Sequence, residues 1–83
     1  MDLNSIKNRI DILELAEHLD IEVNSAHKAR CPFHDDTDPS LTFWPDSNSF
    51  HCFGCNAGGD IFSLVMQKEN LSFGDAVRYL CDF

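Results

Sequence analysis

Two pairs of metal-ligating residues constrain this 83-residue chain more than any other feature. Cys31 and His34 form one pair, Cys52 and Cys55 form the other, and two residues lie between the members of each pair. A knuckle of this spacing sets two donor atoms at the edges of a tight turn, and two knuckles complete a tetrahedron around Zn²⁺. The sequence therefore predicts one structural zinc ion with no open coordination position.

The length of the chain supports a structural role for the metal. The 83 residues correspond to one domain spanning residues 1–83, and a domain this small buries so little surface that a metal, a disulfide or a partner is commonly needed to stabilise it. Structural zinc contributes roughly 10–16 kcal/mol in small peptides, against a net stability of about 5–15 kcal/mol for a whole domain. We therefore expect metal removal to unfold much of the chain.

The predicted donor set argues against catalysis. Three thiolates and an imidazole leave Zn²⁺ a poor Lewis acid without a site for water. A zinc nucleobase deaminase would need His-x-Glu and Pro-Cys-x2-Cys, but Asp35-Asp36 follows His34 and Phe50-His51 precedes Cys52. We expect no catalytic residues and a domain that is not an enzyme on its own.

The other histidines and the last cysteine are weaker ligand candidates. His51 adjoins Cys52, and adjacent strand residues point to opposite faces, so only one of the two is expected to face the metal. His18 and His27 lie outside any ligand spacing, which favours surface or packing roles for both. Cys81 falls in the apolar stripe of the last predicted helix and is expected in the core.

The N-terminus and the overall hydropathy pattern predict a cytoplasmic protein. Residues 1–5 contain neither a basic nor an apolar signal region, and no run of about 18 apolar residues occurs. In a reducing compartment the four cysteines remain thiols that can bind metal, whereas a secreted chain would raise disulfides first. We expect no membrane partner.

Helices are predicted at both ends of the chain. A short helix over 3–9 is followed by one that begins at Asp11, where Glu14 three residues later forms a capping-box pattern, and that ends near Asp20. After a sharp turn at Gly58-Gly59, Asp60 can cap a further helix, and Ser72 can cap the last one. Residues 1–20 and 60–83 are thus the expected helical blocks.

The middle block, residues 27–55, is predicted to be a small antiparallel sheet. Turn signals at residues 38–39 and 45–49 bracket a β-prone run, so strands are expected over 27–31, 40–44 and 49–52. The predicted fold is small α+β, a zinc ribbon flanked by N-terminal and C-terminal helices. Alternation places Thr42 and Trp44 on one face and Leu41 and Phe43 on the other, which leaves one aromatic set available to a ligand.

Several motifs together resemble one known family. They are Cys31-Pro32-Phe33-His34, Pro39-Ser40, the run from Phe50 to Cys55, and Gly58-Gly59-Asp60. This pattern is similar to the zinc-binding domain of bacterial and phage DnaG-type DNA primases, and the flanking helices also fit. In that family the zinc ribbon helps to recognise the single-stranded template at which primer synthesis starts, beside a separate polymerase domain.

The resemblance implies a nucleic-acid face and a role in replication. It places Lys28, Arg30 and His51 on or near that face. The ribbon also contains Phe43, Trp44, Phe50 and Phe53, on which bases could stack, and of these we expect Trp44 at the nucleic-acid site. The implied partners are single-stranded DNA and other replication proteins of the primosome. Either a fragment of a full primase or a short stand-alone protein, as in a mobile element, would fit this sequence.

Net charge favours a second hypothesis. Six Lys and Arg against 14 Asp and Glu give a charge of −8, whereas nucleic-acid modules usually carry a basic footprint. The stretch Asp35-Asp36-Thr37-Asp38 carries three acidic residues where the family commonly has a lysine, and Leu41 stands where an aromatic residue is usual. The alternative is a primase-like zinc module whose acidic helices bind another protein.

Overall fold

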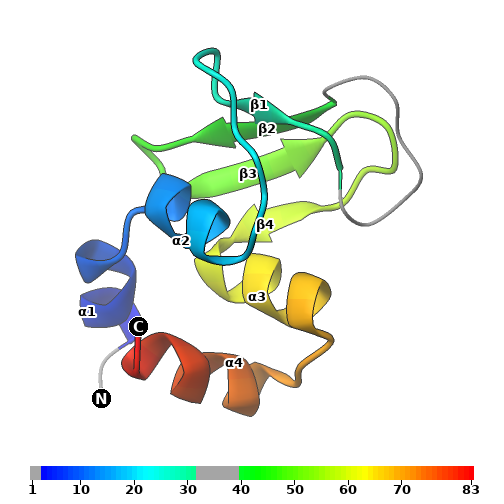
Figure 1. Ribbon diagram of the computed structural model, residues 1–83. Helices are drawn as coiled ribbons and strands as arrows, with labels where there is room; N and C mark the ends of the chain where they lie inside the picture. Colours follow the sequence, from blue (N-terminus) through cyan, green and yellow to red (C-terminus); the bar gives the residue numbers. More distant parts are fainter. Residues whose placement is uncertain (1–2, 32–39) are drawn as a thin grey trace.

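The predicted α+β fold class is confirmed by the computed structural model, which describes residues 3–31 and 40–83. Within these ranges, helices precede and follow the strands along the chain, and the strands form one antiparallel sheet (Figure 1). The elements in chain order are α1 (Leu3–Arg9), α2 (Ile12–His18), β1 (Lys28–Ala29), β2 (Leu41–Trp44), β3 (Ser49–Cys52), β4 (Gly58–Asp60), α3 (Ile61–Glu69) and α4 (Phe73–Cys81).

The sheet follows chain order, β1-β2-β3-β4, and all neighbouring strands are antiparallel. Strand β1 is shorter than the predicted 27–31, since His27 has a positive φ of 61°. Strand β4 is a larger departure, because Gly58-Gly59 was expected to form a sharp turn and instead pairs with β3. Glycine has a low intrinsic strand propensity, so only pairing with β3 reveals this strand.

The predicted helix caps are confirmed. The side chain of Asp11 accepts from the N–H of Leu13, and that of Asp60 accepts from the N–H of Ser63. The Ser72 hydroxyl accepts from the N–H of Asp75. Each cap satisfies a backbone donor that would otherwise lack a partner in the first helical turn.

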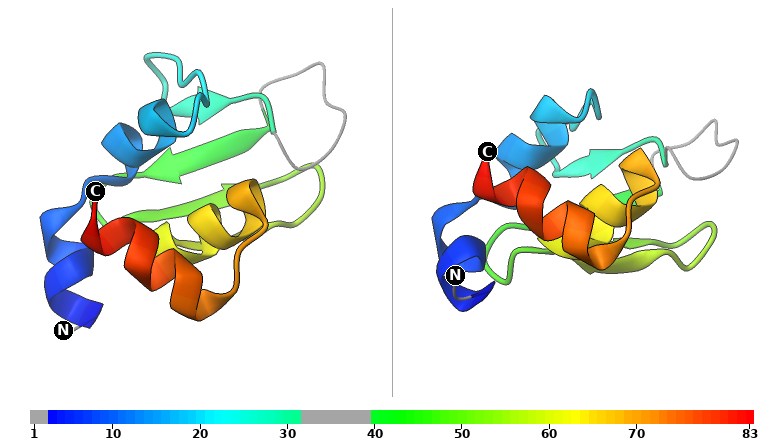
Figure 2. Two further views of the ribbon diagram at one scale, coloured as in Figure 1. Left: turned by 60° about the horizontal axis from the view of Figure 1, so that its bottom comes forward. Right: turned by 90° about the horizontal axis from the view of Figure 1, so that it is seen from below.

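One face of the sheet packs against helices, and this fixes the orientation of every strand residue. Leu41, Phe43 and Phe50 are buried on this face, whereas Trp44 on the opposite face is 42% exposed. The predicted alternation is therefore confirmed. Helices α2 and α3 lie against this buried face, and α4 packs outside α3 (Figures 1 and 2). We call the opposite side, which carries Thr42, Trp44 and His51, the outer face.

Polar side chains tie the helices to the sheet and to one another. Asn48, at the turn between β2 and β3, donates from Nδ2 to the carbonyls of Lys7 and Ile10 and accepts at Oδ1 from the N–H of Ile12. Arg9 donates to the carbonyl of Leu80 at 2.8 Å, which joins α1 to the end of α4. Across residues 3–31 and 40–83, no helix has the length and apolar character needed to span a bilayer.

Candidate metal centre and outer sheet face

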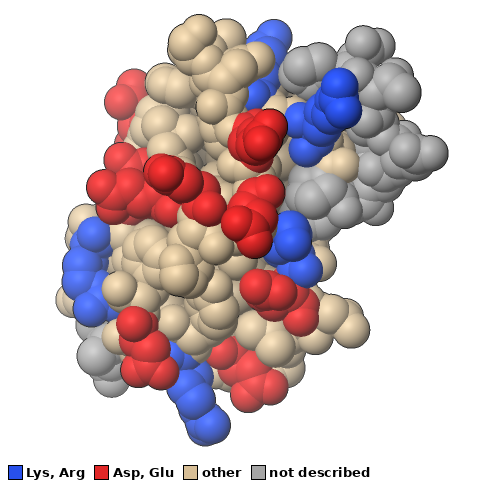
Figure 3. Space-filling view, in the orientation of Figure 1, with Lys and Arg blue, Asp and Glu red and all other residues tan. Residues whose placement is uncertain are grey.

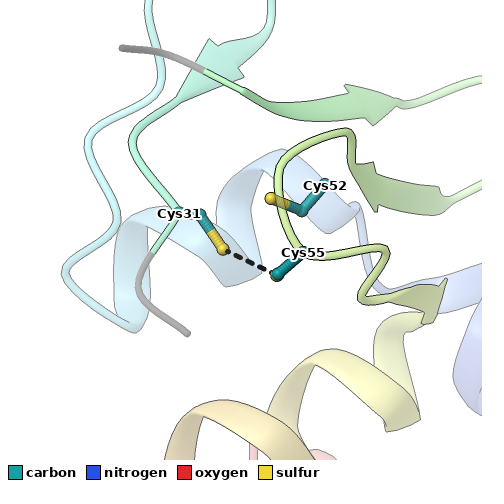
Figure 4. A group of neighbouring side chains, drawn as sticks. All are labelled: Cys31, Cys52 and Cys55. Atoms are coloured by element: carbon teal, nitrogen blue, oxygen red, sulfur yellow. Dashed lines mark hydrogen bonds between the residues drawn. The ribbon is translucent and has the colours of Figure 1, made fainter. Parts of the chain in front are cut away.

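Three of the four predicted ligands converge. Cys31 follows β1, Cys52 ends β3, and Cys55 lies in the loop between β3 and β4, so separate parts of the sheet bring the three side chains together (Figure 4). Their Sγ atoms all lie within 4.8 Å of one another. The fourth predicted ligand, His34, lies outside the described residues.

The sulfur spacing fits a tetrahedral metal site and does not fit a disulfide. The Sγ atoms of Cys31 and Cys55 are 3.6 Å apart, whereas a disulfide bond measures about 2.0 Å. Two sulfurs at the usual Zn–S distance of about 2.3 Å from a tetrahedral ion lie about 3.8 Å apart. The spacing of the Cys31 and Cys55 sulfurs therefore fits two ligands of one Zn²⁺ ion.

The turn after β3 is organised around Cys52. Its carbonyl accepts from the N–H of Asn56 at 2.8 Å, its N–H donates to the carbonyl of Ala57 at 2.7 Å, and Asn56 adopts a positive φ of 63°. The resulting tight loop carries Cys55 back toward the Cys52 sulfur. This is the local geometry that the Cys-x2-Cys spacing predicted.

The surroundings of Cys52 favour its thiolate. Burial raises the pKa of this thiol, but hydrogen bonds from the Ser40 hydroxyl, from the Cys31 side chain and from the backbone N–H groups of Cys55 and Gly54 bring it from 9.0 down to about 6. The Ser40 hydroxyl lies 3.4 Å from Sγ of Cys52. A thiolate is the form that binds metal, so the protein itself prepares this ligand. In the sequence, Ser40 stood out only as part of a family motif.

Other sulfur and imidazole groups of the described chain lie outside this cluster. Cys81 was expected in the core; it is half-buried and packs against the edge of the hydrophobic core. His18 is exposed on α2 and makes edge-on ring contacts with Tyr79 and Phe83. His27 is exposed just before β1.

Two of the predicted nucleic-acid residues, Lys28 and His51, lie in one cross-strand row on the outer face. Lys28 pairs with Thr42, Thr42 pairs with His51, and His51 pairs with Gly58. The His51 ring lies close over this glycine, since a Cβ built on Gly58 would approach Nδ1 of His51 to 2.9 Å. Because Gly58 has no side chain, the imidazole of His51 can lie over the sheet at this position without a steric clash.

Two further aromatic side chains extend the outer face. Trp44 and Phe53 meet edge to face with ring centroids 6.4 Å apart, and Phe53 meets His51 with centroids 4.8 Å apart. Arg30 is exposed just beyond β1. The structure thus places Lys28, Trp44 and His51 on one surface. Phe53, which the sequence offered only as one of four possible stacking residues, lies on the same surface.

A family model described as the CHC2 zinc finger matches residues 1–83. DNA primase from Thermotoga maritima is 38% identical over 80 residues, which cover 94% of this chain and 14% of that protein. DNA primase from Deinococcus radiodurans is 51% identical over 55 residues, covering 66% of this chain and 10% of that protein. The chain thus spans 10–14% of the length of these two relatives.

A solved structure has the same fold. The crystal structure of the Aquifex aeolicus primase, comprising its zinc-binding and RNA polymerase domains, superposes with a TM-score of 0.78 and 34% sequence identity. The match covers 95% of this chain and 20% of the other. The similarity therefore extends over the helices as well as the sheet.

Proposed function

The chain belongs to the CHC2 zinc-finger family found in DNA primases, and on this premise we propose that it is the non-catalytic, zinc-bearing module of a primase that binds single-stranded template DNA. One structural Zn²⁺ is held by Cys31, His34, Cys52 and Cys55. The outer face of the sheet contacts the DNA. The observation that carries the proposal is the convergence of three thiols beside an exposed face with aromatic and basic side chains.

The zinc ion would crosslink parts of the chain that are far apart in sequence. Cys31 follows β1, whereas Cys52 and Cys55 flank the turn after β3. Bound Zn²⁺ supplies this crosslink and a fixed positive charge that stabilises the thiolates. The Ser40 hydroxyl and the backbone N–H groups of the turn donate hydrogen bonds to Cys52, and these bonds favour the thiolate that binds the metal.

The outer face offers both kinds of contact that single-stranded DNA needs. Lys28 is exposed in the same cross-strand row as His51, so a cation for phosphate lies near an imidazole that can contact a base. Trp44 is 42% exposed and provides a stacking surface. Arg30 adds a second exposed cation just beyond β1.

The proposal can be tested by fluorescence anisotropy with a labelled oligothymidylate and the zinc-loaded chain. We expect micromolar or weaker binding at physiological salt, as is usual where few phosphate contacts act. Lys28→Ala with Arg30→Ala should weaken binding and lower the slope of log K against log salt by about 1.4, at about 0.7 for each phosphate that is no longer neutralised.

The matched control is Lys68→Ala with Arg78→Ala, which removes two charges from α3 and α4. This variant has the same net charge as the first but leaves the outer face intact, so its salt slope should stay at the wild-type value. Equal losses of affinity in the two double variants would show that only net charge matters. No detectable binding at about 50 mM salt, where phosphate contacts are strong, would reject the DNA-binding role.

A second function, binding to a basic protein partner, is favoured by one specific surface. Between residues 11 and 22 five acidic side chains are exposed, and Figure 3 shows acidic groups gathered over the helical side of the molecule. A hollow of about 620 Å³ beside α2 is lined by Glu17, Asp20 and Glu22 together with apolar residues that include Leu13 and Val23. Failure of DNA binding would make this surface the leading site.

A further inference from the structure

We propose that Phe53 is the principal base-stacking residue of the outer face, and that the metal-binding turn sets its position. The inference rests on the proposed binding of single-stranded DNA and specifies which side chain receives an unpaired base. The sequence offered Phe53 only as one of four aromatic residues on which bases could stack, and it did not separate Phe53 from the other three.

The exposure of Phe53 is the first observation. Its side chain is 66% exposed, the highest value among the large apolar residues of the described chain, and Trp44 on the same face is 42% exposed. Exposed apolar residues scattered singly need no explanation, whereas contiguous apolar patches are a feature of binding surfaces. Phe53 and Trp44 are in ring contact, so they form such a patch.

The arrangement of the neighbouring rings is the second observation. Phe53 lies between His51 and Trp44, at interplanar angles of 70° and 82° respectively. Edge-on contacts of this kind hold a ring in place through the aromatic quadrupole while burying little of its surface. Phe53 is therefore oriented by its neighbours and still open to a ligand.

The backbone at Phe53 is the third observation. Its N–H donates to the carbonyl of Ser40 at 3.0 Å, and the residue lies between two proposed metal ligands, Cys52 and Cys55. A stacking residue held in this way loses little conformational freedom when a base binds. The hydrogen bond to Ser40 thus fixes the backbone of Phe53 relative to the sheet.

The nature of the occupant follows from the charges nearby. The row that contains His51 also contains the exposed cation Lys28, and a flat aromatic surface beside a cation fits a base together with its phosphate. Stacking on an aromatic ring is tolerant of base identity, since every base has a π-face. We therefore infer an unpaired nucleobase of single-stranded DNA as the ligand of Phe53.

The test compares Phe53→Ala with Phe73→Ala in the anisotropy assay. Phe73 is the matched control because it is also a half-exposed phenylalanine, at 47%, but lies on α4. We expect Phe53→Ala to weaken DNA binding about 5- to 150-fold, which corresponds to the removal of one base stack. Its salt slope should not change, because every cation that faces phosphate is still present, and Phe73→Ala should bind within twofold of wild type.

A third variant keeps the proposal testable if Phe53→Ala disturbs the fold. Phe53→Trp in a Trp44→Phe background places the sole tryptophan at residue 53, and its fluorescence should be quenched when oligothymidylate stacks on it. Zinc content and thermal midpoint serve as folding checks for every variant.

The possible results separate this inference from the proposed function. If wild-type protein binds DNA and Phe53→Ala binds equally well, the stacking role is wrong but DNA binding stands. An unquenched tryptophan at residue 53 in a variant that still binds DNA would likewise overturn the stacking role alone. If wild-type protein does not bind DNA, both proposals fail.

Discussion

Replacing Asn48 should destabilise the fold far more than a turn residue usually does. Its amide group makes three hydrogen bonds across the α1–α2 junction: it donates to the carbonyls of Lys7 in α1 and of Ile10, and it accepts from the N–H of Ile12 at the start of α2. It also adopts a left-handed conformation with φ of 54°. One side chain thus attaches the N-terminal helices to the β2–β3 turn.

The magnitude follows from these two roles. Each hydrogen bond contributes about 0.5–1.5 kcal/mol net, and part-burial of the site places the sum of three bonds at about 2–3 kcal/mol. A left-handed conformation costs a residue with a Cβ about 1 kcal/mol more than glycine. We therefore expect losses of about 3–4 kcal/mol for Asn48→Ala and about 2–3 kcal/mol for Asn48→Gly.

The assay is urea denaturation of the zinc-loaded protein, followed by far-ultraviolet circular dichroism. Asn70 provides the control, because it has nearly the same left-handed conformation, with φ of 56°, at the end of α3. Asn70→Ala carries the conformational cost without the three bonds of Asn48, so a loss of only about 1 kcal/mol is expected. The difference between the two alanine variants measures the attachment itself.

A difference below about 0.5 kcal/mol would refute this reasoning, since it is less than a single hydrogen bond contributes. Asn48→Asp gives an independent check. Aspartate tolerates the left-handed conformation and can still accept from the N–H of Ile12, but it sets a carboxylate against the carbonyls of Lys7 and Ile10. It should therefore be at least as destabilising as glycine, and a stable aspartate variant would contradict the predicted donor role.

Two further predictions concern the metal and the outer face. Elemental analysis should find one zinc per chain, and a strong chelator or Cys52→Ser should lower the far-ultraviolet signal only partly, because the terminal helices persist; an unchanged thermal midpoint after verified zinc removal would contradict this. Gly58→Ala should cost about 1–2 kcal/mol of unfolding free energy, since its Cβ would meet Nδ1 of His51 at 2.9 Å and the Phe50 carbonyl at 3.0 Å. Gly74→Ala, with open space around it, should be neutral or stabilising in the same denaturation assay.

Local sequence patterns predicted those parts of the fold that local chemistry decides. Asp11, Asp60 and Ser72 were expected to cap helices because their side chains precede apolar stripes, and all three do. The period-two pattern of Leu41–Trp44 correctly separated the core face from the outer face. In each case the decisive contacts lie within a few residues along the chain.

Features that depend on distant partners were not predicted. Strand β4 consists of two glycines and an aspartate, Gly58–Asp60. It forms through antiparallel pairing with β3, which no local sequence signal indicates. Asn48 has the sequence signature of an ordinary turn residue, since the carbonyls it binds lie about 40 positions earlier. Phe53 was one aromatic residue among several, and its exposure became known only when the turn after β3 was placed.

The ligand set lies between these two cases. Spacing alone singled out Cys31, Cys52 and Cys55, and the fold brings their sulfurs within 4.8 Å. Spacing could not supply Ser40, whose hydroxyl helps to hold the Cys52 thiolate, because a residue that supports a ligand has no fixed distance from it in sequence. His34 lies outside the described residues and stays a prediction.

Net charge is a coarse guide to the proposed DNA binding, because binding at one face depends on the charges nearest to that face. The five exposed acidic residues between positions 11 and 22 belong to α2 and the segments next to it. The Debye length at physiological salt is about 8 Å, so an exposed carboxylate acts on a phosphate only over about that distance. Lys28, within the row that contains His51, acts at contact distance. If the outer face binds DNA as proposed, its local charge should therefore decide affinity, and the value of −8 for the whole chain should govern only the long-range approach at low salt.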